Sequence, residues 1–552
     1  MSADQLLEGL DDQQREAAET LLGPVCMLAG AGTGKTRAIT HRIAYGVATG
    51  VYPPGRVMAL TFTSRAAGEL RSRLRALGTP GVAARTFHAS ALSQLNYFWP
   101  QVVGGTMPRL IEGKARMLAH AADSLRLKLD TATLRDAAAE VEWRKVSRLS
   151  IDDYARSGRV MPPTLTLERS VDLQRAYEAL KDERRQLDFE DVLLAAAGML
   201  ELEPAVAQQV REQYRFFVVD EYQDVSPLQH DLLQLWLGER NDLCVVGDAS
   251  QTIYSFAGAT PDYLLGFGAE HEDAVVVRLE QNYRSTPAIV DAANRLMRGR
   301  AGALSLQAVA TQTGEAPTVI AARDDSGEAR SIATAIAAQI AAGVPADEIA
   351  VLYRINVQSA AIERALDDAG VSFVLRGATR FFELPEVSQA LMLLSGAAVT
   401  TAANEPLFKT VSDVLRSLGW TQEGPEVRGA VRDRWESLNA LMGLAEEAPA
   451  GTSLRAFVDD LNERKSSQHD PTRNAVTLST IHAAKGLEWR SVYLAGLSEG
   501  LLPISYARTD EAIDEERRLL YVGVTRARET LTLSWSGQQN RVASRFLSDL
   551  QR

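Results

Sequence analysis

A glycine-rich segment near the N-terminus has the residue types that hold a phosphate chain. It follows a short apolar run, 25–29, and leads into a helical pattern, 36–47. Its residues are Ala29, Gly30, Ala31, Gly32, Thr33, Gly34, Lys35 and Thr36. Glycines let the backbone curl so that N–H groups point at phosphate oxygens, and the following helix adds the positive end of its dipole. Lys35 can reach the β- and γ-phosphates and the Thr36 hydroxyl can bind Mg²⁺, although Ala29 stands where the usual pattern has glycine.

Two carboxylates could complete a hydrolytic nucleotide site. Asp220 and Glu221 follow the apolar run 216–219. Carboxylates at the carboxyl end of a parallel strand lie beside a phosphate loop on the same sheet. Asp220 would hold Mg²⁺, and Glu221 would orient and deprotonate the attacking water. Two adjacent acids also form ordinary turns, so this prediction depends on the phosphate loop.

Two arginines could stabilise the charge that develops during phosphoryl transfer. Arg284 ends the segment QNYR, and Arg526 lies in the segment TRAR. A positioned guanidinium is worth roughly 10³–10⁵ in rate, and two that come from a separate domain would couple closure to hydrolysis. Taken alone, each arginine favours a surface or ion-pair role.

These side chains need a scaffold that brings strand ends together, and the hydrophobic pattern predicts one. Apolar strand patterns alternate with helical patterns in two regions, and two further stretches are helical throughout. Such alternation predicts α/β domains with parallel sheets flanked by helices. We expect a first α/β domain at 1–105 and 186–273 with a helical insertion at 106–185. A second is expected at 274–395 and 474–552, with a short helical insertion at 396–473.

Composition excludes several other classes of protein. The chain has 552 residues, 46% of them hydrophobic and 24% charged, which is typical of folded domains. No run approaches the roughly 20 apolar residues that span a bilayer, and the acidic N-terminus is unlike a signal peptide, so we expect a cytoplasmic protein. Cys26 and Cys244 lie in apolar runs and are too few for a zinc site or a disulfide framework, which predicts two reduced core cysteines.

The charge of the chain leaves binding to nucleic acid open. Lys and Arg total 59 against 71 Asp and Glu, a net charge of −12, but clustering of basic residues matters more than the total. One cluster has a single acid, Glu69, among Arg65, Arg71, Arg73, Arg75 and Arg85. Alone it favours a solvated helix face. Only eight lysines occur, so each one raises the question of why arginine would not serve there.

Together, the motifs resemble one family, the superfamily 1 DNA helicases of the UvrD/PcrA/Rep group. The resemblance runs in order from Leu10 to about Leu550. Its motifs are LDDQQREA, AGAGTGKT, LTFTSRAA, TFHA, VVDEYQD, VGDASQTIYSFAGA, LEQNYRS, TLSTIHAAKGLEW and EERRLLYVGVTRARE. Members have two RecA-like P-loop motor domains, each with an inserted, mostly helical subdomain, and they tolerate alanine at the start of the phosphate loop. The resemblance implies this α/β fold and an ATP-dependent 3′-to-5′ DNA helicase or translocase, active in DNA repair or replication.

The resemblance also implies roles for single residues, with ATP and Mg²⁺ as cofactors. Gln251 would sense the γ-phosphate, and Arg284 and Arg526 would be arginine fingers from the second motor domain. The remaining nucleotide contacts would be Gln14 on the adenine, Arg37 and Tyr283 on its two faces, and Glu488 on the ribose. The residues that contact single-stranded DNA would be Phe62, Thr63, Arg65, His88, Tyr254, Phe256, Thr480 and His482.

Departures from the family pattern leave alternatives open. Ser255 and Ala257 remove two positive charges that the family commonly has beside the strand, and Phe256 offers a smaller stacking face than tryptophan. The insertion at 396–473 is short, and the chain ends soon after the last motif, without room for further modules. One alternative is a single-strand translocase that displaces proteins without productive unwinding. Another is a subunit of a larger complex, such as a helicase–nuclease. A kinase or GTPase would leave the later motifs unexplained.

The expected partners follow from the same resemblance. They are single-stranded DNA, tailed duplex DNA, and repair or replication proteins, with no membrane. The expected location is the bacterial cytoplasm, in association with the nucleoid.

Overall fold

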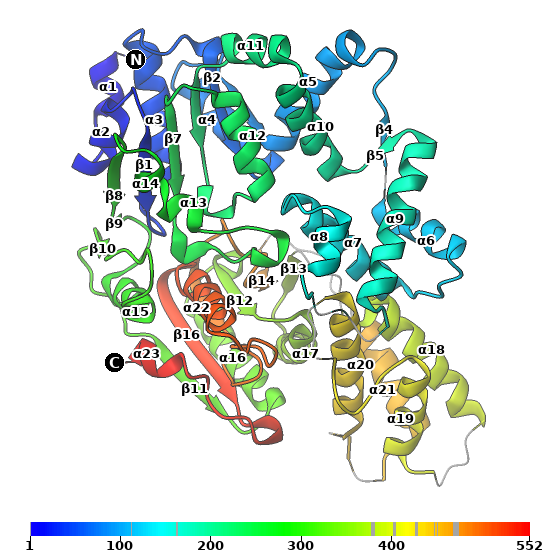
Figure 1. Ribbon diagram of the computed structural model, residues 1–552. Helices are drawn as coiled ribbons and strands as arrows, with labels where there is room; N and C mark the ends of the chain where they lie inside the picture. The colour runs from blue at the N-terminus through cyan, green and yellow to red at the C-terminus, as the bar shows by residue number, and fades with distance from the viewer. Residues whose placement is uncertain are drawn as a thin grey trace. The chain divides into compact units, whose positions relative to one another are not determined.

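The chain folds into two compact units (Figure 1). The computed structural model describes residues 2–111, 113–159, 161, 164–376, 381–400, 405–425, 429–446, 448–449, 451–466 and 474–551. The first unit contains Met1–Val160, Leu165–Arg284 and Met297–Val309. The second contains Met161–Thr164, Ser285–Leu296 and Ala310–Arg552. Both are mixed α/β structures with parallel sheets and flanking helices, as expected of RecA-like domains.

A six-stranded, all-parallel sheet in the order β3-β2-β6-β7-β1-β8 forms the centre of the first unit. Its strands are β1 (Val25–Ala29), β2 (Val57–Thr61), β3 (Ala83–Thr86), β6 (Phe216–Val219), β7 (Leu243–Gly247) and β8 (Val275–Leu279). Its helices are α1 (Ala3–Leu7), α2 (Asp12–Glu19), α3 (Lys35–Ala48), α4 (Ser64–Ala76), α5 (Phe87–Val102), α10 (Phe189–Leu202), α11 (Pro204–Gln213), α12 (Pro227–Leu237), α13 (Asp262–Leu265) and α14 (Phe267–Glu270).

Alternation along these strands divides the core between the two faces of the sheet. Val25 and Met27 pack with residues of α3 and α4, whereas Cys26 packs with residues of α5, α10 and α12. The same alternation puts Cys244 in the first of these cores, on the opposite face from Cys26. Both cysteines are buried and free, as predicted, and burial raises the pKa of Cys26 to about 12. They are therefore packing residues rather than reactive thiols.

A helical insertion interrupts the first unit between β3 and β6. It contains α6 (Lys114–Ser124), α7 (Thr131–Val146), α8 (Ile151–Arg156) and α9 (Leu167–Arg184). The short parallel strands β4 (Arg109–Leu110) and β5 (Gln186–Leu187) pair where the chain enters and leaves these helices. Side-chain caps at Asp130, Ser150 and Thr166 fix where α7, α8 and α9 begin.

Strand β8 belongs to the first sheet, whereas the sequence predicted that residue 274 begins the second domain and therefore that this strand belongs to it. Residues Val25–Ala29 of β1 pair in register with Val275–Leu279. The short pair β9 (Gln281–Asn282) and β10 (Gln307–Ala308) also lies in the first unit. Strand pattern predicts that a strand forms but not which sheet it joins, so the boundary falls near Arg284 instead.

The second unit has its own six-stranded parallel sheet, in the order β11-β16-β15-β12-β14-β13. Its strands are β11 (Thr318–Ala322), β12 (Ile349–Tyr353), β13 (Phe373–Arg376), β14 (Val476–Thr480), β15 (Trp489–Leu494) and β16 (Ala527–Ser536). The accompanying helices are α15 (Pro287–Met297), α16 (Asp325–Ala341), α17 (Ser359–Asp368), α22 (Asp510–Val524) and α23 (Leu547–Gln551).

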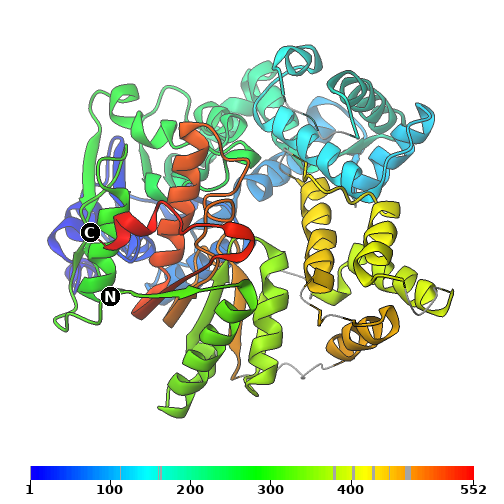
Figure 2. The same cartoon turned by 90° about the horizontal axis from the view of Figure 1, so that it is seen from below.

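Four helices form the insertion of the second unit, the yellow-to-orange group in Figure 2. They are α18 (Pro385–Thr400), α19 (Leu407–Ser417), α20 (Ala430–Glu446) and α21 (Leu454–Ser466). Val387 and Leu391 of α18 share one core with Leu415 and Leu441, so the insertion begins before the predicted residue 396. No helix in the described part of the chain is long and apolar enough to cross a membrane.

Candidate functional site

The phosphate loop connects β1 to α3 and requires glycine at two positions. Gly32 and Gly34 have φ values of +72° and +76°, and Gly34 caps α3. A Cβ at Gly34 would lie 2.7 Å from Gln14 Nε2. Ala29, by contrast, ends β1 in ordinary extended backbone and packs in the core, so this position does not need glycine. The departure from the usual pattern therefore leaves the loop intact.

Lys35 is placed to receive an anion. Its side chain is 12% exposed, and Nζ lies 3.7 Å from Glu221 Oε1. Nζ is buried and makes no hydrogen bond within the described residues. A buried ammonium without hydrogen-bond acceptors is unfavourable, and the oxygens of a triphosphate would supply them. The loop and its lysine therefore fit a nucleotide.

Asp220 follows β6, next to the strand β2 whose Leu60 carbonyl accepts a hydrogen bond from the Asp220 N–H at 2.9 Å. Burial and the neighbouring Glu221 raise the pKa of Asp220 to about 7, while Lys35 opposes the shift. A divalent cation beside this carboxylate would stabilise its ionised form and so oppose the rise in its pKa. No group of three or more His, Cys, Asp or Glu among the described residues could hold a metal ion. A cation held by Asp220 and Thr36 would therefore be shared with nucleotide phosphates, as Mg²⁺ commonly is.

Glu221 has a left-handed backbone that is uncommon outside glycine, with φ of +54°. Its N–H donates to Asp220 Oδ1 at 3.0 Å, and Gln223 Nε2 donates to its Oε2 at 2.5 Å. The fully buried Gln223 also accepts a hydrogen bond from the Asp248 N–H at 3.0 Å. Gln223 therefore fixes the candidate base relative to the end of β7, and strain of this kind is typical of functional sites.

Gln251 is oriented by Asp248, a residue that the sequence placed within a family motif but for which it predicted no role. Gln251 Nε2 donates to Asp248 Oδ2 at 2.8 Å, and the Ser250 N–H donates to Oδ1 at 3.0 Å. Burial raises the pKa of Asp248, while Lys35 opposes this. The roles of Gln223 and Asp248 were missed because amide and carboxylate side chains in turns have no distinctive spacing. The only sequence signal was that both follow strands that end near the phosphate loop.

Arg284 lies in the first unit, which corrects the expectation that it comes from the second domain. The segment 282–284 is bonded to the phosphate loop, because Asn282 Nδ2 donates to the Ala31 carbonyl at 2.7 Å and the Tyr283 N–H donates to the Gly32 carbonyl at 2.9 Å. Asn282 Oδ1 accepts from the Arg284 N–H at 2.9 Å. The physical reason is that β8 joins the first sheet and the following strand β9 pairs with β10 in the same unit, so the chain leaves this unit only after Arg284.

The residues expected to contact adenine also lie in the first unit. Gln14 is buried in α2 and donates from Nε2 to the Thr33 carbonyl at 2.9 Å, which links α2 to the phosphate loop. Tyr283 is 47% exposed, and its hydroxyl donates to Asp11 Oδ2 at 2.6 Å. Partial burial and the Asp11 hydrogen bond raise the pKa of Tyr283 to about 12, so its ring is neutral. Arg37 is exposed on the first turn of α3.

Two predicted nucleotide contacts lie in the second unit, at the amino ends of adjacent strands. Arg526 precedes β16 and is almost fully buried, with Nε donating to the Val522 carbonyl at 2.9 Å and Nη1 to the Leu487 carbonyl at 3.1 Å. Glu488 precedes β15 and is half-exposed, and its Oε1 lies 3.9 Å from Arg528 Nη1. Backbone carbonyls hold the Arg526 guanidinium, which would have to exchange these bonds in order to contact a phosphate.

Most of the residues expected to contact DNA follow strands of the first sheet. Phe62 and Thr63 follow β2, and the Thr63 hydroxyl accepts from the Ala66 N–H at 3.1 Å as the cap of α4. The Phe62 ring lies 6.3 Å from that of Phe87 and packs against the core. Arg65 Nε lies 3.2 Å from Glu69 Oε1, and both side chains are exposed.

His88 stacks on Phe189, an aromatic residue that sequence reasoning missed. The ring centroids lie 4.3 Å apart with an interplanar angle of 27°. Phe189 is 57% exposed, and His88 Nε2 is buried without a hydrogen bond to any described residue. Burial and the charge of Lys114 lower the pKa of His88 to about 4, so its imidazole is neutral at pH 7. The indication available in the sequence was that Phe189 directly follows Asp188, a residue type that caps helices, and therefore occupies the first position of a helix.

Tyr254 and Phe256 form a second aromatic pair, after β7. Their ring centroids lie 6.0 Å apart in an edge-to-face arrangement, and Phe256 is 53% exposed. Ser255 and Ala257 lie in the same short 3₁₀ turn, Ser255–Ala257. In the second unit, Thr480 ends β14, its hydroxyl accepts from the Ala483 N–H at 3.3 Å, and His482 follows two residues later.

Comparisons with known proteins cover nearly the whole chain. The model of the UvrD/REP helicase N-terminal domain matches residues 10–272, and that of the UvrD-like helicase C-terminal domain matches residues 277–422 and 400–538. The ATP-dependent DNA helicase UvrD2 of Mycobacterium tuberculosis H37Rv is 46% identical, with 100% of this chain and 83% of the relative covered. PcrA of Leuconostoc citreum is 30% identical over 100% of this chain and 86% of its own. DNA helicase II of Haemophilus influenzae is 28% identical, covering 100% and 88%.

Proposed function

This chain belongs to the UvrD/Rep family of ATP-dependent DNA helicases, and on that premise we propose that it uses ATP hydrolysis to move 3′ to 5′ along single-stranded DNA and to separate duplex DNA. One observation carries the proposal: the phosphate loop, the Asp220–Glu221 pair, His88 and the Tyr254–Phe256 pair all follow strands of one sheet, and His88 stacks on the exposed Phe189. The polarity rests on family membership. Single-stranded and tailed duplex DNA would be substrates in repair or replication, at the nucleoid.

The nucleotide would be held by residues around the phosphate loop. Lys35 would donate to the β- and γ-phosphates, and Arg37 and Tyr283 would enclose the adenine beside Gln14. Mg²⁺, held by Thr36 and Asp220, would neutralise phosphate charge when bound. Glu488 would accept from the ribose hydroxyls.

Glu221 is the proposed general base for hydrolysis. Its carboxylate would take a proton from the attacking water, because its left-handed backbone and the Gln223 hydrogen bond hold it beside Lys35. Gln251, oriented by Asp248, would contact the γ-phosphate. Arg284 and Arg526 would stabilise the charge that develops on the transferred group.

Coupling to DNA would pass through the segment 248–256. Gln251 is three residues from Tyr254, so one short segment joins the proposed γ-phosphate contact to the Tyr254–Phe256 pair. A change in the bound nucleotide would therefore alter the affinity for DNA through this one short segment. Phe62, Thr63, Arg65, His88, Thr480 and His482 would form further contacts along the strand.

Steady-state ATP hydrolysis tests this function. Turnover is measured with no polymer, single-stranded DNA, blunt duplex DNA and single-stranded RNA at one fixed salt concentration, since phosphate contacts make affinity salt-dependent. We expect strong stimulation by single-stranded DNA alone, and turnover in Glu221→Gln that falls by about 10²–10⁴-fold with ATP binding retained. Glu212→Gln, an exposed acid on α11, is the matched control. Equal turnover with all four additions, or normal turnover in Glu221→Gln, would contradict the proposal.

A translocase that does not unwind DNA is the second candidate. The observation that favours it is that Ser255 and Ala257, the neighbours of the exposed Phe256 in its 3₁₀ turn, carry no charge themselves. Unwinding of a duplex with a 3′ single-stranded tail by the purified protein separates the two functions. Strand separation supports the helicase, whereas DNA-stimulated hydrolysis without separation supports the translocase.

A further inference from the structure

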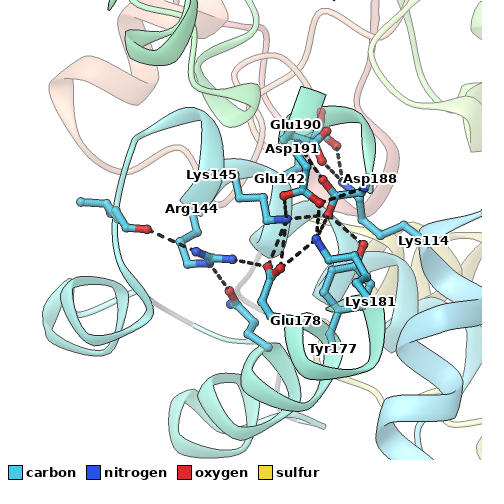
Figure 3. A network of polar contacts seen from close by, with 12 residues as sticks. Lys114, Glu142, Arg144, Lys145, Tyr177, Glu178, Lys181, Asp188, Glu190 and Asp191 are labelled. Atoms are coloured by element: carbon cyan, nitrogen blue, oxygen red, sulfur yellow. Dashed lines mark hydrogen bonds and ion pairs between the residues drawn. The ribbon is translucent and has the colours of Figure 1, made fainter. Parts of the chain in front are cut away.

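A buried network of charges joins the first helical insertion to the start of α10, and the proposed function does not use it (Figure 3). We call it the lysine network and define it as Lys145, Glu178, Lys181, Asp188 and Asp191. Lys145 lies on α7, Glu178 and Lys181 on α9, and Asp188 and Asp191 at the start of α10. The side chains of Lys145, Lys181 and Asp188 are 2%, 3% and 0% exposed. Glu178 and Asp191 are 27% and 15% exposed, so three helices meet at a cluster of charges whose centre is buried.

Both lysines contact the same three carboxylates. Lys145 Nζ lies 2.7 Å from Asp188, 2.5 Å from Asp191 and 3.1 Å from Glu178. Lys181 Nζ lies 3.1 Å from Asp188 and 2.7 Å from Glu178, and it also pairs with Asp191. An ammonium directs three N–H groups from one point, whereas a guanidinium directs its donors within a plane. This geometry explains lysine at two positions of a chain that has only eight.

Electrostatics keeps the network charged. Burial alone would lower the pKa of Lys181, but Asp188, Asp191 and Glu178 outweigh it and raise that pKa. Burial alone would raise the pKa of Asp188, but Lys145 and Lys181 hold it well below its ordinary value. The Tyr177 hydroxyl also donates to Asp188 Oδ2 at 2.9 Å. The result is a rigid set of mutually dependent contacts, since each charge relies on the others for its solvation.

Two residues of the lysine network, Asp188 and Asp191, flank one exposed aromatic residue in the sequence. Asp188 caps α10, accepting from the Asp191 N–H at 3.0 Å, while Asp191 accepts from the Asp188 N–H at 2.9 Å. Between them, Glu190 pairs with Lys114 of α6 at 2.6 Å. Of the four residues 188–191, three are therefore bound to lysines of the insertion helices. The fourth is Phe189, which is exposed and stacks on His88.

Stability alone does not account for this arrangement. Burying ions costs desolvation that their attraction only partly returns, and apolar residues of similar volume commonly stabilise a core equally well. What an ionic network adds is a defined geometry, because each contact depends on distance and direction. Here the defined geometry is that of the residues on both sides of Phe189.

We propose that Lys145 and Lys181 are positioning residues for DNA binding. They hold Phe189 against His88, and the helical insertion thereby fixes how this aromatic pair contacts single-stranded DNA. This inference rests on the proposed function, since it assumes that the His88–Phe189 pair contacts DNA. Within the described part of the chain, the ion pairs of the lysine network do not include the residues assigned to the nucleotide. Its effect is therefore on the affinity for DNA and not on the hydrolytic site.

The test uses the full chain and two conservative variants, Lys145→Arg and Lys181→Arg, which keep the charge but change the donor geometry. The readout is the concentration of single-stranded DNA that gives half-maximal stimulation of ATP hydrolysis, measured with the DNA-independent rate and the melting temperature. We expect this concentration to rise about tenfold, within the range that loss of one base-stacking contact produces. The DNA-independent rate should stay unchanged. Lys128→Arg, at an exposed lysine of the same insertion, should change neither quantity.

A double-mutant comparison separates positioning from general stability. In a Phe189→Ala background, Lys145→Arg should cause no further loss of DNA affinity, because the residue that it positions is gone. An equal loss in both backgrounds, an unchanged DNA concentration in both lysine variants, or failure of both variants to fold would overturn the proposal. Wild-type protein without any DNA stimulation would instead overturn the proposed function, so the two failures are distinguishable.

Discussion

At the scale of the residue, the phosphate loop depends on backbone conformations that only glycine adopts cheaply. A left-handed glycine flanks each end of helix α3, Gly34 before it at φ +76° and Gly50 after it at φ +78°. They differ in their surroundings, because a Cβ at Gly34 would lie 2.7 Å from Gln14 Nε2, whereas a Cβ at Gly50 meets nothing within 4 Å. Substitutions at these two glycines therefore distinguish the free energy needed for left-handed backbone from the effect of a side chain on the phosphate loop.

Substituting each glycine with alanine tests this difference. Both Gly34→Ala and Gly50→Ala should lower the free energy of unfolding by about 1–2 kcal/mol, the cost of left-handed backbone for an L-residue. Only Gly34→Ala should also weaken ATP binding, because it displaces Gln14 and the turn that carries Lys35. Denaturant unfolding and nucleotide titration measure the two effects. Equal ATP affinity in the two variants would mean that the loop tolerates a side chain at Gly34.

At the scale of the element, the positions of site residues that follow predicted strands could be predicted from the sequence. Asp220 was placed beside the phosphate loop of Lys35 because both follow apolar runs and parallel strands gather their carboxyl ends, whereas Phe62 was assigned from the resemblance. The position of Arg284 could not be predicted, since it depends on which sheet β8 joins, a tertiary choice without a local pattern. Phe189 was missed for a related reason, because its partner His88 is distant in the sequence. The start of α18 was missed because its apolar face suits either an insertion or a motor domain.

The 3₁₀ turn after β7 gives the prediction at this scale. Phe256→Ala should raise the single-stranded DNA concentration for half-maximal stimulation by about 5- to 150-fold, since stacking contributes ~1–3 kcal/mol per base. The change in ATP affinity should be much smaller. Phe408→Ala is the control, because Phe408 on α19 is 52% exposed and Phe256 is 53% exposed. Equal loss of DNA and ATP affinity in Phe256→Ala would show that the turn supports the fold and not a stacking contact.

At the scale of the whole molecule, an acidic protein must bind a polyanion. The net charge of −12 repels DNA at long range, so affinity has to come from local basic residues and from aromatic stacking. Arginines on α4 and β3, among them Arg65, Arg71 and Arg85, supply positive charge near the strand ends that carry Phe62 and His88. The balance between ionic and stacking contacts is a property of the whole surface, and the salt dependence of binding measures it.

We expect the logarithm of the association constant for single-stranded DNA to fall linearly with the logarithm of salt concentration, with a slope of about −0.7 for each phosphate neutralised. Three such contacts would weaken binding by roughly 10- to 20-fold between about 50 and 200 mM salt. Arg65→Ala should make the slope shallower by about 0.7, because it removes one ionic contact. Phe256→Ala should lower affinity at every salt concentration and leave the slope unchanged, since stacking releases no counterions. If the two variants instead changed the slope alike, the aromatic turn would be acting by positioning phosphate contacts. The assignment of ionic contacts to arginine and of stacking contacts to Phe256 would then be wrong.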